Sequence, residues 1–406
     1  MTWEYATQIA FDEAVQAIAR VAALHRMPSE YAALSRAHGR ILAQDIVAPM
    51  PLQPFDNSAM DGYALRHADL GAQGETVLHL AGEQFAGPDR VLHVGPGECV
   101  RITTGAPMPA GADTVVIREH VHAGDDGIRI PAGIRPGANV RLAGEDVRAG
   151  DRVLLAGSVL TPARISLAAA LGLAQLEVAQ RPTVAVFTTG DELVEPGLPL
   201  PRGTIYNSHR ELLMGLLRAD GLEPTAWPTL PDEPARVASM LRDAASSFDV
   251  VVTCGAVSAG EKDHIPALLA EHGRIHFWKV RMKPGMPVLF GDLDRARFLG
   301  LPGNPVSVLA TWLTLGRALV DGLQGRTEPR PRFHACLSEA VDKRHARREF
   351  VRGRLASGEN GVLRVAPDPG TGSHRLAAAS TADALIVVPE DTQALPAGSV
   401  VQVLPL

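Results

Sequence analysis

Between residues 182 and 323 the sequence alternates apolar runs with amphipathic segments, and this alternation constrains the fold more than any other feature. Runs such as TVAVFTT and DVVVT are continuously apolar, whereas SHRELLMGLLRADG carries apolar residues at helical spacing. Strands that are apolar on both faces are typical of a mainly parallel sheet with helices on both sides. We therefore predict an α/β domain over residues 181–326.

The segments flanking this domain have a different character. Residues 1–49 carry apolar side chains at helical intervals, and residues 147–180 become helical again, so the two are expected to form one helical linker domain. Residues 50–146 contain short apolar stretches separated by Gly, Pro and Asp, which is typical of an inserted β-rich domain. Short strands return in residues 327–406 and predict a small C-terminal β-barrel. The predicted fold class is multidomain, α/β plus β.

Charge and cysteine content exclude several classes of protein. The net charge of −6 gives no bulk attraction to nucleic acid or to an anionic membrane, and the apolar runs are shorter than a membrane span. Cys99, Cys254 and Cys336 are far apart and lack the spacing of a zinc site or a disulfide framework. The N-terminal segment contains acidic residues and is typical of an amphipathic helix rather than a signal peptide. We expect a cytoplasmic protein without nucleic-acid or membrane partners.

Three loops that follow predicted strands carry residues suited to binding an anion or a metal. They are TTGDEL, CGAVSAGEKD and GLPGNPVS. Ligands of such sheets lie beyond the carboxyl ends of the strands, so the three loops are expected to face one site. Ordinary turn formation explains any one of them, but three at one sheet edge favour a site. The residues singled out are Gly190, Asp191, Glu192, Gly255, Ser258, Asp263, Pro302, Asn304 and Pro305.

Lysines and carboxylates near these loops suggest the chemistry. Lys279 and Lys283, in HFWKVRMKPGMP, are placed to neutralise a phosphate or oxyanion, although two solvated lysines explain the same spacing. Asp191, Glu192, Asp232 and Asp263 supply the oxygen ligands that Mg²⁺ prefers. Amides that bind phosphate, combined with clustered carboxylates, favour a substrate containing a metal-bound phosphoanhydride.

Motifs along nearly the whole chain resemble those of the molybdopterin molybdenumtransferase family, which includes the bacterial MoeA proteins and the C-terminal domain of gephyrin. Besides the three loops, these motifs are PFDNSAMDGYAL (54–65), ITTGAPMPAGADTVV (102–116), LAGEDV (142–147) and KVRMKPGMP. The resemblance implies an enzyme that takes adenylyl-molybdopterin and molybdate, cleaves the adenylate with Mg²⁺, and releases molybdenum cofactor and AMP. It also implies an elongated homodimer whose active sites lie between the α/β domain and a partner's β domain. Transient contacts with the adenylyltransferase and with downstream molybdoenzyme maturation proteins are further expectations.

The resemblance also assigns residues to the two walls of this cleft. The β-domain wall would position molybdate or the dithiolene and consists of Asp61, Thr104, Arg141 and Asp146. On the opposite wall Glu192, Asp232 and Asp263 would hold magnesium, and Lys279, Lys283 and the amides around Ser258 and Asn304 would bind phosphate or molybdate. Pro302 and Pro305 would shape the floor, and Ser373 would approach its edge from the last domain. A turn-forming role for Asp61 and a loop-capping role for Asp146 are the alternatives.

Two positions depart from the family pattern. Ala256 stands where relatives usually have the second glycine of a Gly-Gly pair, and a Cβ penalises positive φ. The loop is therefore expected either to avoid that conformation or to be slightly reshaped. Met286 stands where relatives often carry a further lysine, so anion binding would rest on Lys279 and Lys283.

Two other functions are compatible with parts of the chain. The α/β domain also resembles molybdopterin adenylyltransferases, and gephyrin uses a related domain as a non-catalytic scaffold. The FDNSAMDGY and GEDV motifs and the additional β domains favour molybdate insertion, because stand-alone adenylyltransferases lack them.

Overall fold

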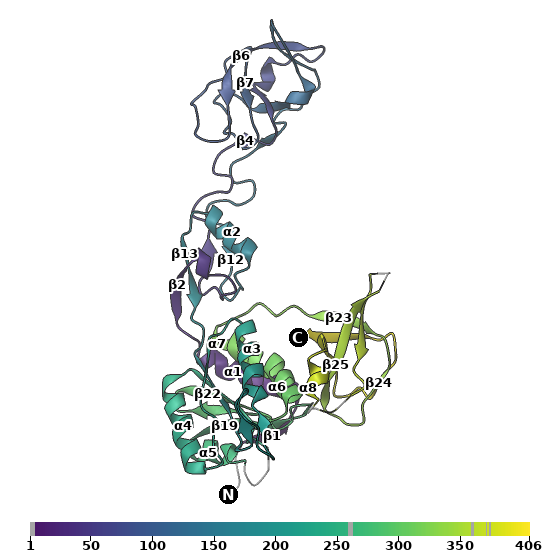
Figure 1. Cartoon of the computed structure of the whole chain (residues 1–406). Helices are drawn as coiled ribbons and strands as arrows, with labels where there is room; N and C mark the ends of the chain where they lie inside the picture. The colour runs from purple at the N-terminus through teal and green to yellow at the C-terminus, as the bar shows by residue number, and fades with distance from the viewer. Residues whose placement is uncertain (1–4, 259–262, 359–360, 371, 373–374) are drawn as a thin grey trace.

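A computed structural model describes residues 5–258, 263–358, 361–370, 372 and 375–406. Figure 1 shows an elongated molecule with a β domain at one end and a narrow middle domain next to it. The α/β domain lies at the other end, beside the C-terminal barrel. The predicted combination of α/β and β domains is therefore present.

The sheet of the α/β domain has the strand order β1-β19-β21-β22-β18-β14-β17 within the described residues. Its strands are Ala6–Ile9 (β1), Val184–Thr188 (β14), Pro224–Ala226 (β17), Val250–Cys254 (β18), Gly273–Val280 (β19), Leu289–Leu293 (β21) and Ala296–Leu301 (β22). Strand β21 runs antiparallel to both of its neighbours, and the other pairs of neighbours are parallel. The sheet is mainly parallel, as the continuous apolar runs predict.

Helices cover both faces of this sheet. They are Phe11–Leu24 (α1), Ser208–Ala219 (α3), Pro234–Ser247 (α4), Ile265–His272 (α5), Pro305–Thr311 (α6) and Arg317–Leu323 (α7), with the π-helical segment Trp312–Gly316 (η4) between the last two. Alternate residues of β14 enter separate cores. Val184 and Val186 pack with α1, α3, α6 and α7, whereas Ala185 and Phe187 pack with α4 and α5. The continuous helix Pro305–Leu323 is long and apolar enough to cross a membrane, but most of it is buried inside the protein, as in a core helix.

The N-terminal segment differs from the prediction of a helical region over residues 1–49. Its one α-helix within the described residues is α1, and the rest consists of strands, a 3₁₀ turn and loops. Strand β1 pairs with β19, and Phe11, Ala14, Ile18 and Ala22 of α1 pack into the α/β core. The apolar spacing therefore marks a helix correctly but does not show that this helix packs on the α/β domain.

The middle domain connects the α/β domain to the β domain. It contains Ser29–Ala33 (β2), Ile46–Val47 (β3), Arg152–Leu154 (β12), Pro162–Ala170 (α2) and Gln175–Ala179 (β13). Strand β2 pairs with β13 and β3 with β12, so the chain leaves and returns through adjacent strands. Leu42, Leu160 and Val178 lie in its apolar core.

The β domain is a sheet with the order β8-β5-β7-β6-β10-β9 within the described residues. Its strands are Gly62–Leu65 (β5), Thr76–Gln84 (β6), Glu98–Ile102 (β7), Thr114–Ile117 (β8), His122–Gly124 (β9) and Gly127–Ile130 (β10). A short antiparallel pair, Asn57–Ser58 (β4) with Val140–Arg141 (β11), lies on the side towards the middle domain.

The C-terminal domain is a closed barrel in which β25 pairs with both β26 and β27. Its strands are Phe333–Leu337 (β23), Arg348–Ser357 (β25), Leu363–Pro367 (β26), Ala384–Val388 (β27) and Val400–Pro405 (β29). Met282–Lys283 (β20), from the α/β domain, pairs in parallel with the start of β25. This pairing fixes the barrel against the carboxyl edge of the α/β domain.

Candidate functional site

The three strand-end loops line one cavity of about 360 Å³ at the carboxyl edge of the α/β sheet. The first contributes Gly190 and Glu192, the second Gly255 and Ser258, and the third Pro302. The structure thus brings together three loops, the first and last of which are more than a hundred residues apart in sequence, as expected for a sheet of this type.

Close packing explains the glycines in these loops. Gly190 has a φ of 126°, and a Cβ there would collide with the Glu192 carboxylate. Gly255 has a φ of 102°, and a Cβ there would collide with the Thr189 hydroxyl of the first loop. Both positions therefore need glycine for the backbone conformation and for the space.

The buried side-chain amide of Asn207 supports the first loop. Asn207 is the N-cap of α3, where its side chain accepts from the Arg210 backbone N–H at 3.4 Å. Its Nδ2 donates to Thr188 Oγ1 at 2.8 Å, so one side chain joins the end of β14 to the start of α3.

Glu192, Asp232 and Asp263 all line this cavity. Asp263 accepts a hydrogen bond from Ser258 Oγ at 2.5 Å. Asp191 instead lies outside the cavity lining, where its Oδ1 accepts from the Asp232 backbone N–H at 3.3 Å. Hence Glu192, Asp232 and Asp263 form part of the cavity wall, while Asp191 supports the Asp232 loop.

The donor set suits a hard cation such as Mg²⁺ because every candidate ligand is a carboxylate oxygen. Across the residues that the structure describes, however, no group of three His, Cys, Asp or Glu side chains is close enough to hold a metal by itself. Protein sites for Mg²⁺ usually use one or two carboxylates together with substrate phosphates. The arrangement therefore fits a cation that arrives with, or is completed by, a phosphate-bearing substrate.

His209, which was not predicted from the sequence, also lines the cavity. Its Nε2 is buried and has no hydrogen-bond partner within the described residues. Burial lowers the pKa of this imidazole, against a weaker opposing effect of the nearby Glu192. The residue lies in the first turn of α3, and this position alone does not reveal that its imidazole lines the cavity.

A second cavity, of about 310 Å³, lies between the α/β domain and the C-terminal barrel. Pro287 and Pro302 line both cavities, so the two adjoin. Lys283 lines the second cavity, where its Nζ forms an ion pair with Glu349 of β25 at 2.9 Å. The parallel pairing of β20 with β25 sets Lys283 opposite Glu349 and so creates this contact.

The remaining predicted residues of the α/β wall have different surroundings. Asn304 is the N-cap and Pro305 the first residue of α6, as predicted, although the Asn304 side chain makes no capping hydrogen bond. Asn304 lines the second cavity. Lys279 lies outside both cavities, with its Nζ 4.3 Å from the centre of the Trp278 ring. Ser373 lies outside the described residues.

The residues predicted in the β domain form a separate group. Asp61 Oδ1 accepts from the Thr104 backbone N–H at 2.8 Å and from Thr104 Oγ1 at 2.9 Å. These two hydrogen bonds, the backbone one first, lower the pKa of the Asp61 carboxyl. Asp61 therefore links the NSAMDGYA segment to the TTGAP loop.

Arg141 and Asp146 lie near the segments that carry Asp61 and Thr104. Arg141 pairs with Asn57 in the β4–β11 ladder. The backbone N–H of Asp146 donates to the Leu52 carbonyl at 3.3 Å, and both side chains are exposed. The three β-domain motifs thus meet through short backbone pairings.

Within one chain the predicted residues of the β domain do not meet those of the α/β domain. Figure 1 shows the β domain at the far end of the molecule, with the middle domain between it and the α/β domain.

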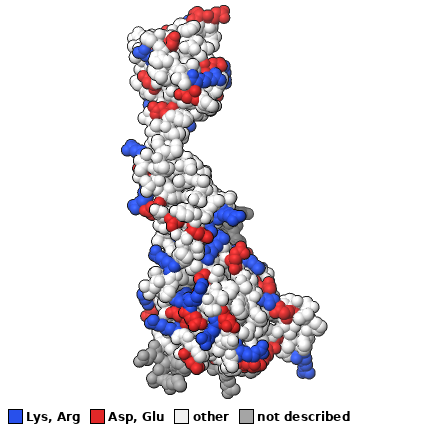
Figure 2. All heavy atoms as spheres, turned by 90° about the vertical axis from the view of Figure 1, so that its left-hand side faces the viewer, with Lys and Arg blue, Asp and Glu red and all other residues white. Residues whose placement is uncertain are grey.

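Figure 2 shows acidic and basic side chains interspersed over the face turned towards the viewer. Because the net charge of −6 gives no bulk attraction, attraction of an anion must arise locally, in the cavities.

Three family models match the chain in order. They are the MoeA N-terminal region (domain I and II) over residues 9–172, the Probable molybdopterin binding domain over residues 185–321, and the MoeA C-terminal region (domain IV) over residues 334–406. The chain is 39% identical over 394 residues to the Molybdopterin molybdenumtransferase of Haemophilus influenzae, which covers 95% of this chain and 97% of that protein. This chain belongs to the molybdopterin molybdenumtransferase family.

Other members of the molybdopterin molybdenumtransferase family agree with this assignment. Molybdopterin molybdenumtransferase 2 of Mycobacterium tuberculosis is 37% identical over 381 residues, covering 91% of this chain and 93% of its own. The crystal structure of the molybdopterin biosynthesis moeA protein from Pyrococcus horikoshii OT3 superimposes with a TM-score of 0.83 at 28% identity, covering 98% of this chain and all of that one. The predicted resemblance and the multidomain fold are therefore confirmed, and the chain is a transferase of molybdenum cofactor biosynthesis.

Proposed function

We propose that this enzyme inserts molybdate into adenylyl-molybdopterin and releases AMP in a magnesium-dependent reaction. The observation that carries the proposal is the pair of adjoining cavities that share Pro287 and Pro302. One is lined by carboxylates and glycine-rich loops, and the other by three cationic side chains and two carboxylates. Such a pair suits two substrates, one that carries a metal-bound phosphate and one that is an oxyanion. The family name of the relatives, molybdopterin molybdenumtransferase, supports the same reaction.

Each group of residues has a role in this proposal. Glu192, Asp232 and Asp263 hold Mg²⁺ together with the substrate phosphate, and the loop around Gly255 and Ser258 receives the phosphate. When bound, Mg²⁺ neutralises phosphate charge and so favours departure of AMP.

The cavity beside the barrel receives molybdate in this proposal. Lys283 and Asn304, which line it, offer an ammonium group and an amide to an oxyanion. Lys279 acts indirectly, because its position on Trp278 places it outside the cavity. Trp278 Nε1 in turn donates to the Val257 carbonyl at 2.7 Å and thereby supports the second loop.

The β-domain residues enter through a partner chain in our proposal. Asp61, Thr104, Arg141 and Asp146 lie far from both cavities of their own chain. A homodimer would allow the β domain of one protomer to cover the cavities of the other, as elongated subunits with a two-fold axis permit. We further propose that the enzyme works in the cytoplasm and receives its substrate from the adenylyltransferase.

The decisive experiment supplies the purified protein with adenylyl-molybdopterin, molybdate and Mg²⁺. We expect AMP release and activation of a cofactor-free molybdoenzyme, both dependent on molybdate and Mg²⁺. Glu192→Ala and Asp61→Ala should abolish both readouts while retaining the wild-type circular dichroism spectrum, because each removes a carboxylate from the proposed site without emptying a core. Near wild-type turnover in either variant would contradict the site. ATP-dependent adenylylation of molybdopterin would instead identify an adenylyltransferase, and peptide binding without turnover a scaffold.

A further inference from the structure

An imidazole lines the cavity of the three strand-end loops, beside the carboxylates proposed to hold the cation. It belongs to His209, in the first turn of α3, and Glu192, Asp232 and Asp263 line the same cavity. Glu192 is near enough for its charge to act on the His209 ring. The cavity therefore offers a nitrogen donor as well as oxygen donors.

The two ring nitrogens of His209 have different surroundings. Burial lowers the pKa of the ring, so the imidazole is uncharged at neutral pH. A hydrogen bond with the Gly303 backbone opposes this effect on the pKa, as a bond does when a ring N–H donates to a carbonyl oxygen. Nε2 is buried and has no hydrogen-bond partner within the described residues, so the donor is Nδ1. The neutral ring therefore keeps an unused lone pair on Nε2.

This arrangement is the one that metal-binding histidines adopt. Such a histidine coordinates the metal through one ring nitrogen, while the N–H of the other donates to a backbone carbonyl or a carboxylate. In His209 the Gly303 carbonyl has that supporting place, and Nε2 is left for the metal. A phosphate oxygen would instead be repelled by the Nε2 lone pair, because both are acceptors. The lone pair therefore suits a cation.

We propose that His209 Nε2 is a ligand of the cation in this cavity, together with Glu192 and a phosphate oxygen of the substrate. The inference rests on the proposed function for that phosphate. No three His, Cys, Asp or Glu side chains in the described part of the chain are close enough to hold a metal without such help. A mixed set of nitrogen and oxygen ligands favours a first-row transition ion, whereas Mg²⁺ prefers oxygen. The site therefore binds Mn²⁺ more tightly than Mg²⁺.

The test records electron spin-echo modulation of Mn²⁺ bound to the full-length protein with AMP, which supplies the phosphate. This method detects a nitrogen bonded to Mn²⁺, and labelling the histidines with ¹⁵N separates an imidazole nitrogen from the nitrogens of adenine. Wild type should show a nitrogen coupling that changes on labelling. Bound Mn²⁺ without such a coupling would overturn the inference and leave the proposed function standing.

Two variants assign the coupling to a residue. His209→Asn replaces the imidazole by an amide whose oxygen suits Mg²⁺. The coupling should disappear and the Kd for Mn²⁺ should rise about tenfold, while the Kd for Mg²⁺ stays within about threefold. His272→Asn is the matched control, since it removes an exposed imidazole at the end of α5, outside the cavity. It should leave the coupling and both Kd values unchanged.

The outcomes separate this inference from the proposed function. A coupling that persists in His209→Asn, or an equal loss of affinity for Mn²⁺ and Mg²⁺, would overturn the role of His209. Failure of wild type to bind either cation with AMP would overturn both the inference and the proposed metal dependence. Thermal unfolding shows whether His209→Asn remains folded. If it does not, the spectrum of labelled wild type still decides, because His209 is the histidine among the described residues that line the cavity.

Discussion

Ala256 adopts the left-handed backbone region, with a φ of 54°, in the second strand-end loop. The sequence left open whether this loop avoids that conformation, and the structure shows that it does not. A left-handed alanine costs about 1–2 kcal/mol relative to an ordinary conformation. The half-buried methyl group, however, packs against the core formed with Phe187 and Val257, which recovers about 0.8 kcal/mol per buried carbon. Burial of this half-buried methyl therefore offsets only part of the strain at this position.

Substitutions at Ala256 should reveal this balance. Ala256→Gly removes the strain and the methyl burial together, so we expect the free energy of unfolding to change by less than about 1 kcal/mol. Ala256→Val keeps the positive φ and adds a β-branch, which should destabilise the protein by about 2 kcal/mol. Urea denaturation of both variants measures these differences. A large gain in stability for Ala256→Gly would show that the methyl contributes nothing.

Sequence reasoning identified cavity-lining residues where the signal is local. Glu192, Ser258 and Pro302 were found because each follows a recognisable strand directly, and the ends of parallel strands must share an edge. The pairing of Lys283 with Glu349 was missed because it depends on how the barrel docks through β20. His209 was missed because its first-turn position in α3 does not reveal that its imidazole lines the cavity.

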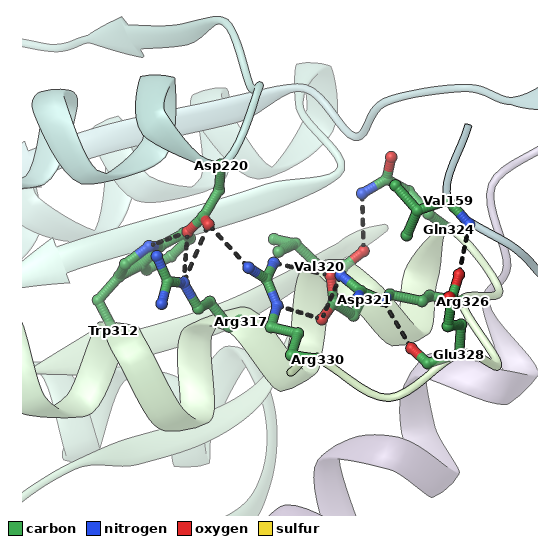
Figure 3. A network of polar contacts seen from close by, with 10 residues as sticks. All are labelled: Val159, Asp220, Trp312, Arg317, Val320, Asp321, Gln324, Arg326, Glu328 and Arg330. Atoms are coloured by element: carbon green, nitrogen blue, oxygen red, sulfur yellow. Dashed lines mark hydrogen bonds and ion pairs between the residues drawn. The ribbon is translucent and has the colours of Figure 1, made fainter. Parts of the chain in front are cut away.

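At the scale of elements, one polar network joins α3, α7 and the segment leading to the barrel (Figure 3). The Asp220 carboxylate is almost fully buried and accepts from Trp312 Nε1 at 2.8 Å, from Arg317 Nε at 2.9 Å and from Arg330 Nη1 at 3.1 Å. Arg330 also forms a two-pronged pair with Asp321. These contacts hold the segment after α7 against the α/β domain before the chain enters the barrel.

The same segment contacts the middle domain through Glu328. Its carboxylate accepts from Arg164 Nη1 and Nη2 at 2.6 and 3.0 Å, and from the Val159 backbone N–H at 3.1 Å. The Arg164 hydrogen bonds, followed by that from Val159, lower the pKa of Glu328 from 4.5 to about 2. Glu328 is therefore charged in the folded protein well below the pH at which an ordinary glutamate becomes neutral.

Glu328 should make the junction with the middle domain sensitive to acid. Because its pKa is lower in the folded protein, its stabilising effect is complete above pH 4.5 and is lost as the pH falls towards 2. At neutral pH, Glu328→Gln should lower the free energy of unfolding by about 1 kcal/mol, since the carboxylate is about one-third exposed and is screened by solvent. Thermal unfolding across this pH range should show the two proteins converging at low pH. The exposed Glu339→Gln serves as control, and a constant difference at every pH would contradict this role.

At the scale of the whole molecule, the order of domains was predictable but some of their contacts were not. The switch from alternating strand and helix to short strands separated by turns marks the change from the α/β domain to the C-terminal barrel. The placement of β1 and α1 on the α/β domain depends on pairing with β19, more than 260 residues away, and no local pattern encodes it. Long-range pairings of this kind are the part of the fold that a single sequence leaves open.

The elongated shape leads to a prediction about shared active sites. If the β domain of one protomer completes the site of the other, Asp61→Ala and Glu192→Ala variants should each be inactive alone but active after mixing. Random exchange makes about half of the dimers mixed, and each mixed dimer has one site with both residues intact, so about a quarter of wild-type AMP release is expected. Light scattering first tests whether the protein is a dimer. AMP release is then measured after the subunits have exchanged.

A second mixture provides the control for this experiment. Wild type mixed equally with the double variant Asp61→Ala/Glu192→Ala should give about a quarter of full activity if sites are shared, because every site of a mixed dimer then carries one substitution. If each chain formed its own site, this mixture would retain about half of full activity, and the two single variants would stay inactive together. The two mixtures thus give opposite patterns for shared and separate sites. The separation of Asp61 from Glu192 along the molecule favours sharing.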